Sequence, residues 1–134
     1  MSAHEVRVEV TPLQTDGMRD VLGDVIQRQI FADHGIDVGK VRSIRGYLIR
    51  SQYDASEIEP HVQDIFSDPI IEYGVTNTSL LEDKTFFPSP PILTVTVGFK
   101  PGVTDNPGAA ANDGFRILFP KGESTIATYI SYAF

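Results

Sequence analysis

The residues best suited to acid–base or metal chemistry in this chain are its histidines, His4, His34 and His61, because imidazole titrates near neutral pH. A metal site or a general acid–base pair needs two such groups, or one with carboxylates, at ligand spacing. The sequence contains no HxH, HxxxH or HExxH spacing and no cysteine. We therefore predict no catalytic, cofactor-binding or metal-binding residues, and we interpret the histidines as solvent-facing or helix-capping side chains.

A second candidate is the loop at residues 102–108, which has the sequence GVTDNPG and precedes a predicted helix. A helix N-terminus can hold an anion, but the loop lacks the glycine spacing of GxGxxG and GxxxxGK[ST] phosphate loops. Asp105 is therefore predicted to cap the helix or to form an Asx-turn.

Basic residues concentrate on one predicted strand, and they are Lys40, Arg42, Arg45 and Arg50. One interpretation is a solvated strand edge, where lysine hinders the addition of further strands. The other is a contact for an acidic partner or a phosphate. We favour the first, since nearby carboxylates can pair with these cations. The candidate partner contacts are Arg42, Arg45, Lys100 and Asp105.

Hydrophobic periodicity predicts strand, helix, strand, helix and strand in residues 1–78. The strands are expected at 5–10, 38–51 and 70–75. A slip in alternation at Arg45-Gly46 predicts a β-bulge, so residues 38–51 are expected to form one long bent strand or two short ones. The first helix runs from Met18 to Gly35, which suits a left-handed C-cap. Its apolar stripe, centred on Val25 and Ile26, is expected to face the core.

The second predicted helix begins near the sequence SEIE at residues 56–59, which fits a capping box with Ser56 as the cap. Pro60 falls in its first turn, so the helix is expected to start at Ser56 or slightly later.

A proline-rich linker is predicted at residues 79–91, because prolines cannot pair as a central strand. Residues 92–134 then repeat the opening pattern as strand 92–99, a helix with Pro107 in its first turn, and strand 124–134. We interpret them as a partial second copy of the unit in residues 1–78. The expected fold class is α+β, an antiparallel sheet with helices on one face.

Three motifs resemble the small PurS-type subunit of phosphoribosylformylglycinamidine synthase. Residues 100–107, KPGVTDNP, are similar to its KPGVxDPxG opening, residues 68–72, DPIIE, to its NPVIE, and residues 41–49 to its VxxVRxGKxI strand. The module also occurs as tandem copies at the N-terminus of the fused large synthetase, and the present chain resembles that duplicated region. The first copy departs from the pattern, since residues 11–17 lack KPGV.

The resemblance implies a non-catalytic structural part of this ATP- and glutamine-dependent ligase, in purine biosynthesis. It would contact the synthetase and glutaminase parts, help to form the path for ammonia, and bind no cofactor itself. The alternative is a ferredoxin-like regulatory module of the ACT type, which would bind an amino acid or similar molecule at its strand-to-helix loops.

Composition and charge also indicate which classes of partner the chain is expected to bind. The formal net charge is −7, which disfavours sequence-independent binding to nucleic acid or anionic lipid. No apolar run has the length of a membrane helix and the N-terminal residues lack a signal-peptide core, so a cytoplasmic protein is expected. The partial second copy would leave an apolar sheet face uncovered, which predicts a homo-oligomer.

Overall fold

The computed structural model describes residues 3–13, 19–68 and 71–134, and within them five strands form one antiparallel sheet in the order β3-β1-β2-β5-β4. The strands are β1 (His4–Pro12), β2 (Arg42–Ser51), β3 (Glu72–Thr76), β4 (Thr94–Gly98) and β5 (Thr125–Ala133). The helices are α1 (Val21–His34), α2 (Ala55–Ile58), α3 (Val62–Ile65) and α4 (Asn106–Leu118), with short 3₁₀ turns η1 (Glu59–His61) and η2 (Leu80–Glu82). The predicted α+β class is confirmed.

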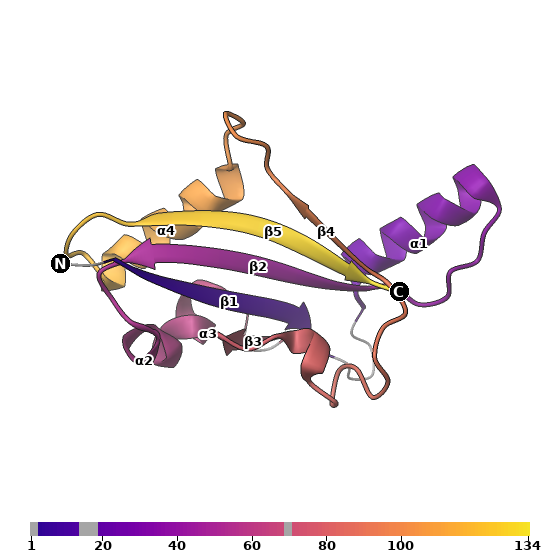
Figure 1. Ribbon diagram of the computed structural model, residues 1–134, viewed down its shortest axis with the longest axis horizontal. Coiled ribbons are helices and arrows are strands. Elements are labelled where there is room, and N and C mark those ends of the chain that lie inside the picture. The colour runs from indigo at the N-terminus through magenta and orange to yellow at the C-terminus, as the bar shows by residue number, and fades with distance from the viewer. Residues whose placement is uncertain (1–2, 14–18, 69–70) are drawn as a thin grey trace.

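The main core lies between the sheet and the helices α2, α3 and α4 (Figure 1). Alternation places Val6, Val8 and Val10 of β1 on this face, where all three are buried. Phe115 of α4 and Phe119, the C-cap of that helix, pack on them and on the α2–α3 segment, and the side chain of Tyr53 meets both rings edge-on. These contacts hold the helices to one face of the sheet.

A smaller core covers part of the opposite face. Its buried side chains are Ile44, Leu80, Phe86, Phe87 and Ala133. Three of them belong to the predicted linker at residues 79–91, which folds over the sheet and includes η2. The proline-rich segment therefore connects β3 to β4 and also covers apolar surface.

Residues 1–78 and 92–134 share one sheet, because β2 pairs with β5 from Arg42↔Ala133 to Arg50↔Thr125. The register of β1 against β2 is also continuous, from His4↔Ser51 to Val10↔Arg45. The predicted β-bulge at Arg45-Gly46 is therefore wrong. Gly46 is needed for another reason, since an added Cβ would lie 1.9 Å from the Tyr129 ring.

Two predictions about helices need correction. The cap of α2 is Asp54, whose carboxylate accepts a hydrogen bond from the Glu57 N–H while the Glu57 side chain accepts one from the Asp54 N–H. The capping box thus begins two residues before Ser56, whose hydroxyl donates to the Asp54 carboxylate. Pro60 lies in the following 3₁₀ turn.

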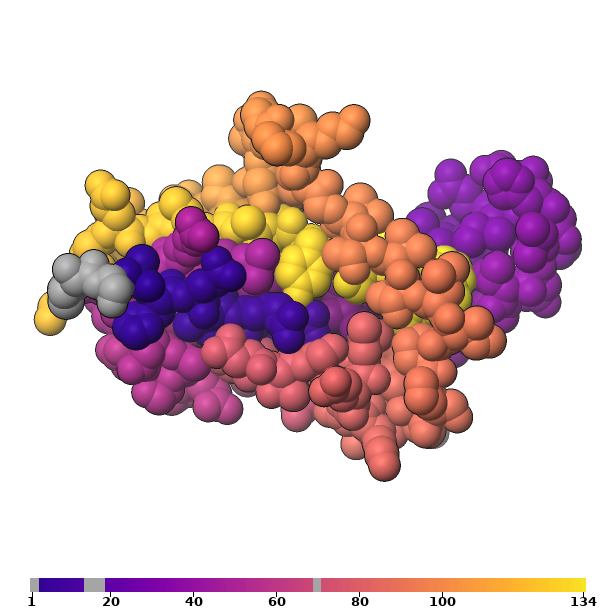
Figure 2. All heavy atoms as spheres, viewed as in Figure 1, coloured from indigo at the N-terminus to yellow at the C-terminus, as the bar shows by residue number. Residues whose placement is uncertain are grey.

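The second correction concerns α1, whose apolar stripe does not enter the core. Gly23 is its buried residue, while Val25 is 45% exposed and Ile26 is half-buried. The helix ends as predicted at Gly35, which is left-handed at φ 66° and donates its N–H to the Phe31 carbonyl. Figures 1 and 2 show α1 projecting from one end of the sheet. Met18 lies outside the described residues. Among the residues described, no helix has the length and apolar character to cross a bilayer.

Candidate functional site

The N-terminus of α1 is fastened to β2 by one buried carboxylate. Asp20 caps the helix by accepting a hydrogen bond from the Gly23 N–H at 2.9 Å. It also accepts hydrogen bonds from the backbone N–H and the hydroxyl of Ser43, both at 2.6 Å. Helix and strand approach so closely that a Cβ on Gly23 would lie 2.0 Å from the Val41 carbonyl oxygen. Only glycine lets the helix start directly against this strand.

The same arrangement fastens α4 to β5. Asp105 accepts hydrogen bonds from the Gly108 N–H at 2.7 Å, from the Thr128 N–H at 2.6 Å and from the Thr128 hydroxyl at 2.7 Å. A Cβ on Gly108 would lie 2.3 Å from the Ile126 carbonyl oxygen. The predicted capping role of Asp105 is confirmed. The matching role of Asp20 was not predicted, although both sites share the spacing D-x-x-G.

These two fastenings are related by an approximate two-fold axis through the sheet. Ser43 pairs with Tyr132 and Thr128 pairs with Tyr47, so the Arg45↔Ile130 pair lies midway between them. Both helices therefore begin on the same face and run in opposite directions, α4 along the sheet and α1 past its end (Figure 1). The part of the sheet between the two helix starts is left without a covering helix.

That part of the sheet forms a groove of about 380 Å³, which we call the sheet groove. Its walls are mainly aromatic and aliphatic, and they include Tyr47, Val97, Phe99, Pro107, Ile130 and Tyr132. Burial raises the pKa of the Tyr47 hydroxyl, so its neutral form is favoured. The groove therefore suits apolar groups with few charges.

The apolar surface continues onto the edge strand β4. Val95 is 41% exposed and Val97 is 54% exposed. The strand has the sequence TVTVG, without the charges or prolines that usually protect an edge, and no described strand pairs with its outer side. An uncharged edge beside an apolar groove is typical of a surface that another chain covers.

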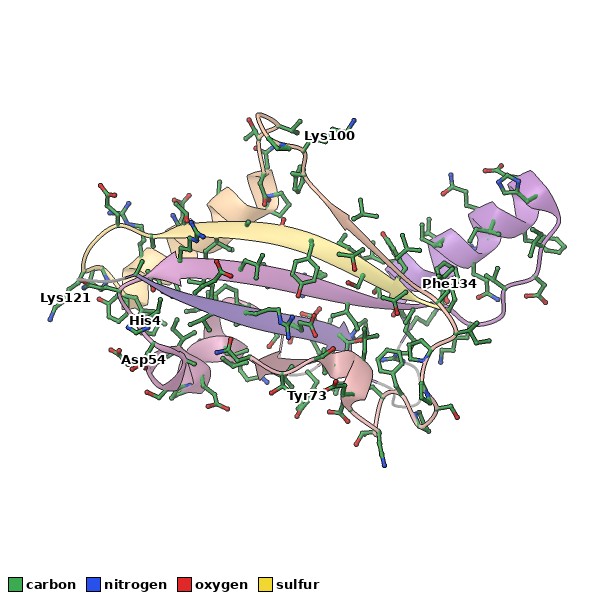
Figure 3. All side chains as sticks on the ribbon, viewed as in Figure 1. His4, Asp54, Tyr73, Lys100, Lys121 and Phe134 are labelled. Atoms are coloured by element: carbon green, nitrogen blue, oxygen red, sulfur yellow. The ribbon has the colours of Figure 1, made fainter. Side chains whose placement is uncertain are left out.

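The predicted contact residues fall in different places. Arg42 is buried at the start of β2. The Asp105 carboxylate already accepts hydrogen bonds as the N-cap of α4. Arg45 lines the sheet groove and forms an ion pair with Glu72 at 2.5 Å. Figure 3 shows Lys100 at the tip of the loop between β4 and α4, directed away from the sheet. The side chains of Arg45 and Lys100 are accessible at the surface.

A polar network on the opposite face was not predicted. The Tyr129 hydroxyl donates to the buried Glu9 carboxylate at 2.7 Å, and the Leu80 N–H donates to the same carboxylate at 2.9 Å. Burial and the nearby Glu9 charge raise the pKa of Tyr129 above its ordinary range. The network joins β1, β5 and η2, and its one sequence signal is Gly46, which leaves room for the Tyr129 ring.

The histidines do not converge on one site. His4 begins β1, His34 ends α1, and His61 lies 3.5 Å from the Asp64 carboxylate and against the Phe119 ring. Within the part of the chain that the structure describes, no group of three or more histidine, aspartate or glutamate side chains is arranged to hold a metal ion.

Comparison of the chain with protein-family models, with curated proteins and with solved structures finds no match. The functional assignment therefore depends on the sequence motifs and on the surfaces described above.

Proposed function

We propose that this chain is a non-catalytic structural part of phosphoribosylformylglycinamidine synthase, where it bridges the synthetase and glutaminase parts in the cytoplasm. The observation that carries the proposal is the sheet groove with its continuation onto β4. Contact with a protein partner removes these exposed apolar side chains from water, and this burial is favourable in free energy. A bridging module needs such a surface.

A second observation supports the resemblance to a duplicated module. The Asp20–Gly23–Ser43 and Asp105–Gly108–Thr128 arrangements each combine an aspartate, a glycine and a hydroxyl residue, with the same hydrogen bonds and the same close helix–strand approach. Such agreement is expected if two copies of one strand–helix–strand unit lie in the chain. The KPGV motif also precedes the second of these caps, at residues 100–103.

The test is reconstitution with a synthetase that lacks this module. The purified chain alone should neither hydrolyse ATP nor release ammonia from glutamine. Added to the synthetase and glutaminase parts, it should bind them and restore glutamine-dependent turnover. No binding and no restored turnover would contradict the proposal.

Matched variants locate the contact. Val97→Glu places a charge in the sheet groove, whereas Ile117→Glu places the same charge at a 79% exposed position on α4. We expect Val97→Glu to weaken association at least about tenfold, because an unpaired charge is costly in a desolvated interface. Ile117→Glu should leave association unchanged, and equal losses would place the contact elsewhere.

The alternative function is a regulatory module that binds an amino acid. One observation favours it, namely that Gly98, Phe99 and Pro107 bring a strand-to-helix loop into the wall of the sheet groove. A thermal-shift screen against amino acids and nucleotides separates the two functions. A shift of several degrees with one amino acid, together with no binding to the synthetase, would favour the regulator.

A further inference from the structure

A second groove, of about 550 Å³, combines a buried cation with an apolar wall at one end of the sheet. We call it the Arg42 groove. It lies where β2 begins, and Figure 1 shows the segment between η2 and β4 passing there beside the C-terminal end of β5. The backbone holds this segment in place, since the Ile92 N–H donates to the Phe134 carbonyl and the Phe134 N–H to the Leu93 carbonyl.

The cation is the Arg42 guanidinium, and the residue is 7% exposed. Its Nη2 atom donates to the Pro12 carbonyl at 2.9 Å and to the Thr11 hydroxyl at 3.3 Å. Its Nε atom is buried and has no hydrogen-bond partner among the described residues. Buried donors are normally paired, so this arginine is incompletely satisfied by the protein.

The charge of Arg42 also lacks a direct counter-ion, since no described carboxylate lies within ion-pair distance of it. Asp20 is the carboxylate that acts on it most, but its oxygens are occupied by Gly23 and Ser43. Burial lowers the pKa of the guanidinium below its ordinary value, because desolvation disfavours the charged form. Lys40, which is exposed, adds a second cation to the same groove.

The apolar wall consists of Phe86, Phe87, the prolines at 88, 90 and 91, and Ile92. The Arg42 guanidinium lies 5.6 Å from the Phe86 ring centroid and 6.0 Å from that of Phe87, so the two rings hold it in position. The phenylalanine rings are flat, the proline rings are rigid, and the exposed Ile92 side chain adds apolar surface. Such a wall favours a flat apolar group over a flexible polar one.

We propose that the Arg42 groove binds a small monocarboxylate with an aromatic body, its carboxylate beside Lys40 and Arg42 and its ring against the proline-rich wall. Arginine recognises planar carboxylates well because its donors form a rigid fork. A monocarboxylate loses less hydration on entry beside the buried Arg42 guanidinium than a phosphate dianion does. The proposal does not depend on the scaffold function.

The test is a titration of the full chain with phenylacetate, followed by the NMR signals of the backbone amides. We expect saturable shifts at residues 40–42, 86, 87 and 92, in the millimolar range or tighter. Benzyl alcohol has the ring without the charge and acetate has the charge without the ring. Each should bind at least about tenfold more weakly. Phenyl phosphate tests the charge preference and should bind no more tightly than phenylacetate.

Paired variants connect the binding to the two cations. Arg42→Met should abolish the shifts, whereas Arg50→Met, an exposed arginine at the other end of β2, should not change them. Lys40→Gln removes an exposed charge and should weaken binding at least about threefold. The control, Lys121→Gln, removes an exposed charge outside the groove and should leave binding unchanged. The Lys40 pair keeps the proposal testable even if Arg42→Met fails to fold.

Three results would overturn the proposal: no saturable binding of phenylacetate, equal binding of benzyl alcohol, or shifts confined to the sheet groove. Tighter binding of phenyl phosphate would replace the carboxylate with a phosphate as the ligand class.

Discussion

Asp20 and Asp105 each hold a helix and a strand together at a single buried or half-buried carboxylate. A carboxylate removed from water is costly unless it accepts several hydrogen bonds, and each of these accepts three. The glycine three residues later makes the arrangement possible, because any side chain there would collide with a strand carbonyl. Residue identity at two positions thus sets where each long helix begins.

We predict opposite effects for two glycine substitutions in α4. Gly108→Ala should lower the free energy of unfolding by about 1–3 kcal/mol, since its Cβ would lie 2.3 Å from a backbone oxygen. Gly114→Ala is the matched control, because no atom lies within 4 Å of its Cβ position. It should stabilise the chain by about 0.5–1 kcal/mol through helix propensity. Urea denaturation measures both, and a neutral Gly108→Ala would show that α4 is able to shift away from β5.

At the scale of elements, the start of α2 depends on Asp54 and not on Ser56. Hydrogen bonds from the Ser56 hydroxyl and the Glu57 N–H lower the pKa of Asp54 below its ordinary value of 3.8. A carboxyl whose pKa is lowered by folding stabilises the native state above the unfolded pKa. That stabilisation disappears as the pH falls through the folded pKa.

We therefore predict that Asp54→Ala lowers the urea midpoint at pH 7 more than Ser56→Ala does. The difference between wild type and Asp54→Ala should shrink as the pH is lowered below 3.8, because the wild-type cap is then protonated. Unfolding followed by circular dichroism at several pH values measures this difference. A gap that stays constant down to pH 2 would contradict the assignment of Asp54 as the ionised cap.

Sequence periodicity was a good guide to the strands and a weaker guide to burial. The alternation of β1 is a local property, so its buried face was predicted correctly. The stripe of α1 is equally regular, but its burial depends on which elements lie beside it, and α1 runs past the end of the sheet. At Asp54 and Ser56 two overlapping capping boxes fit the residues equally well. The sequence around Gly46 wrongly predicts a bulge. The glycine is needed to leave room for the Tyr129 ring, and Tyr129 lies on a strand far along the chain.

In the candidate site, too, features that depend on local sequence were predicted and features that depend on contacts between distant segments were not. The helix cap of Asp105 follows from its own loop and was predicted. The sheet groove forms from β2, β4, β5 and the start of α4, so neither its lining nor the burial of Arg42 follows from any single segment. Only the full sheet order brings these residues together.

At the scale of the whole molecule, apolar surface is exposed on two neighbouring features, the sheet groove with β4 and the helix α1. Phe31 of α1 is 59% exposed, and Val21 is 62% exposed. We predict that the isolated chain forms a dimer or tetramer at micromolar concentrations, because both features bury this surface on association.

Sedimentation equilibrium tests this prediction. Phe31→Ser should shift the chain toward monomer, whereas Ile117→Ser, at an exposed position on α4, should not. A wild-type monomer that also fails to bind an exposed-hydrophobe dye would contradict the prediction.

The position of β5 beside the central strand β2 has a consequence for how the chain reaches this fold during synthesis. The ribosome releases β1, β2 and β3 first, yet one edge of β2 stays unpaired until β5, the last described strand, emerges. Contacts between residues so far apart in sequence form slowly, because a long loop must close before they are gained. The nascent chain therefore carries an open central strand from the release of β2 until the release of β5, and during this interval the unpaired edge of β2 is exposed to aggregation.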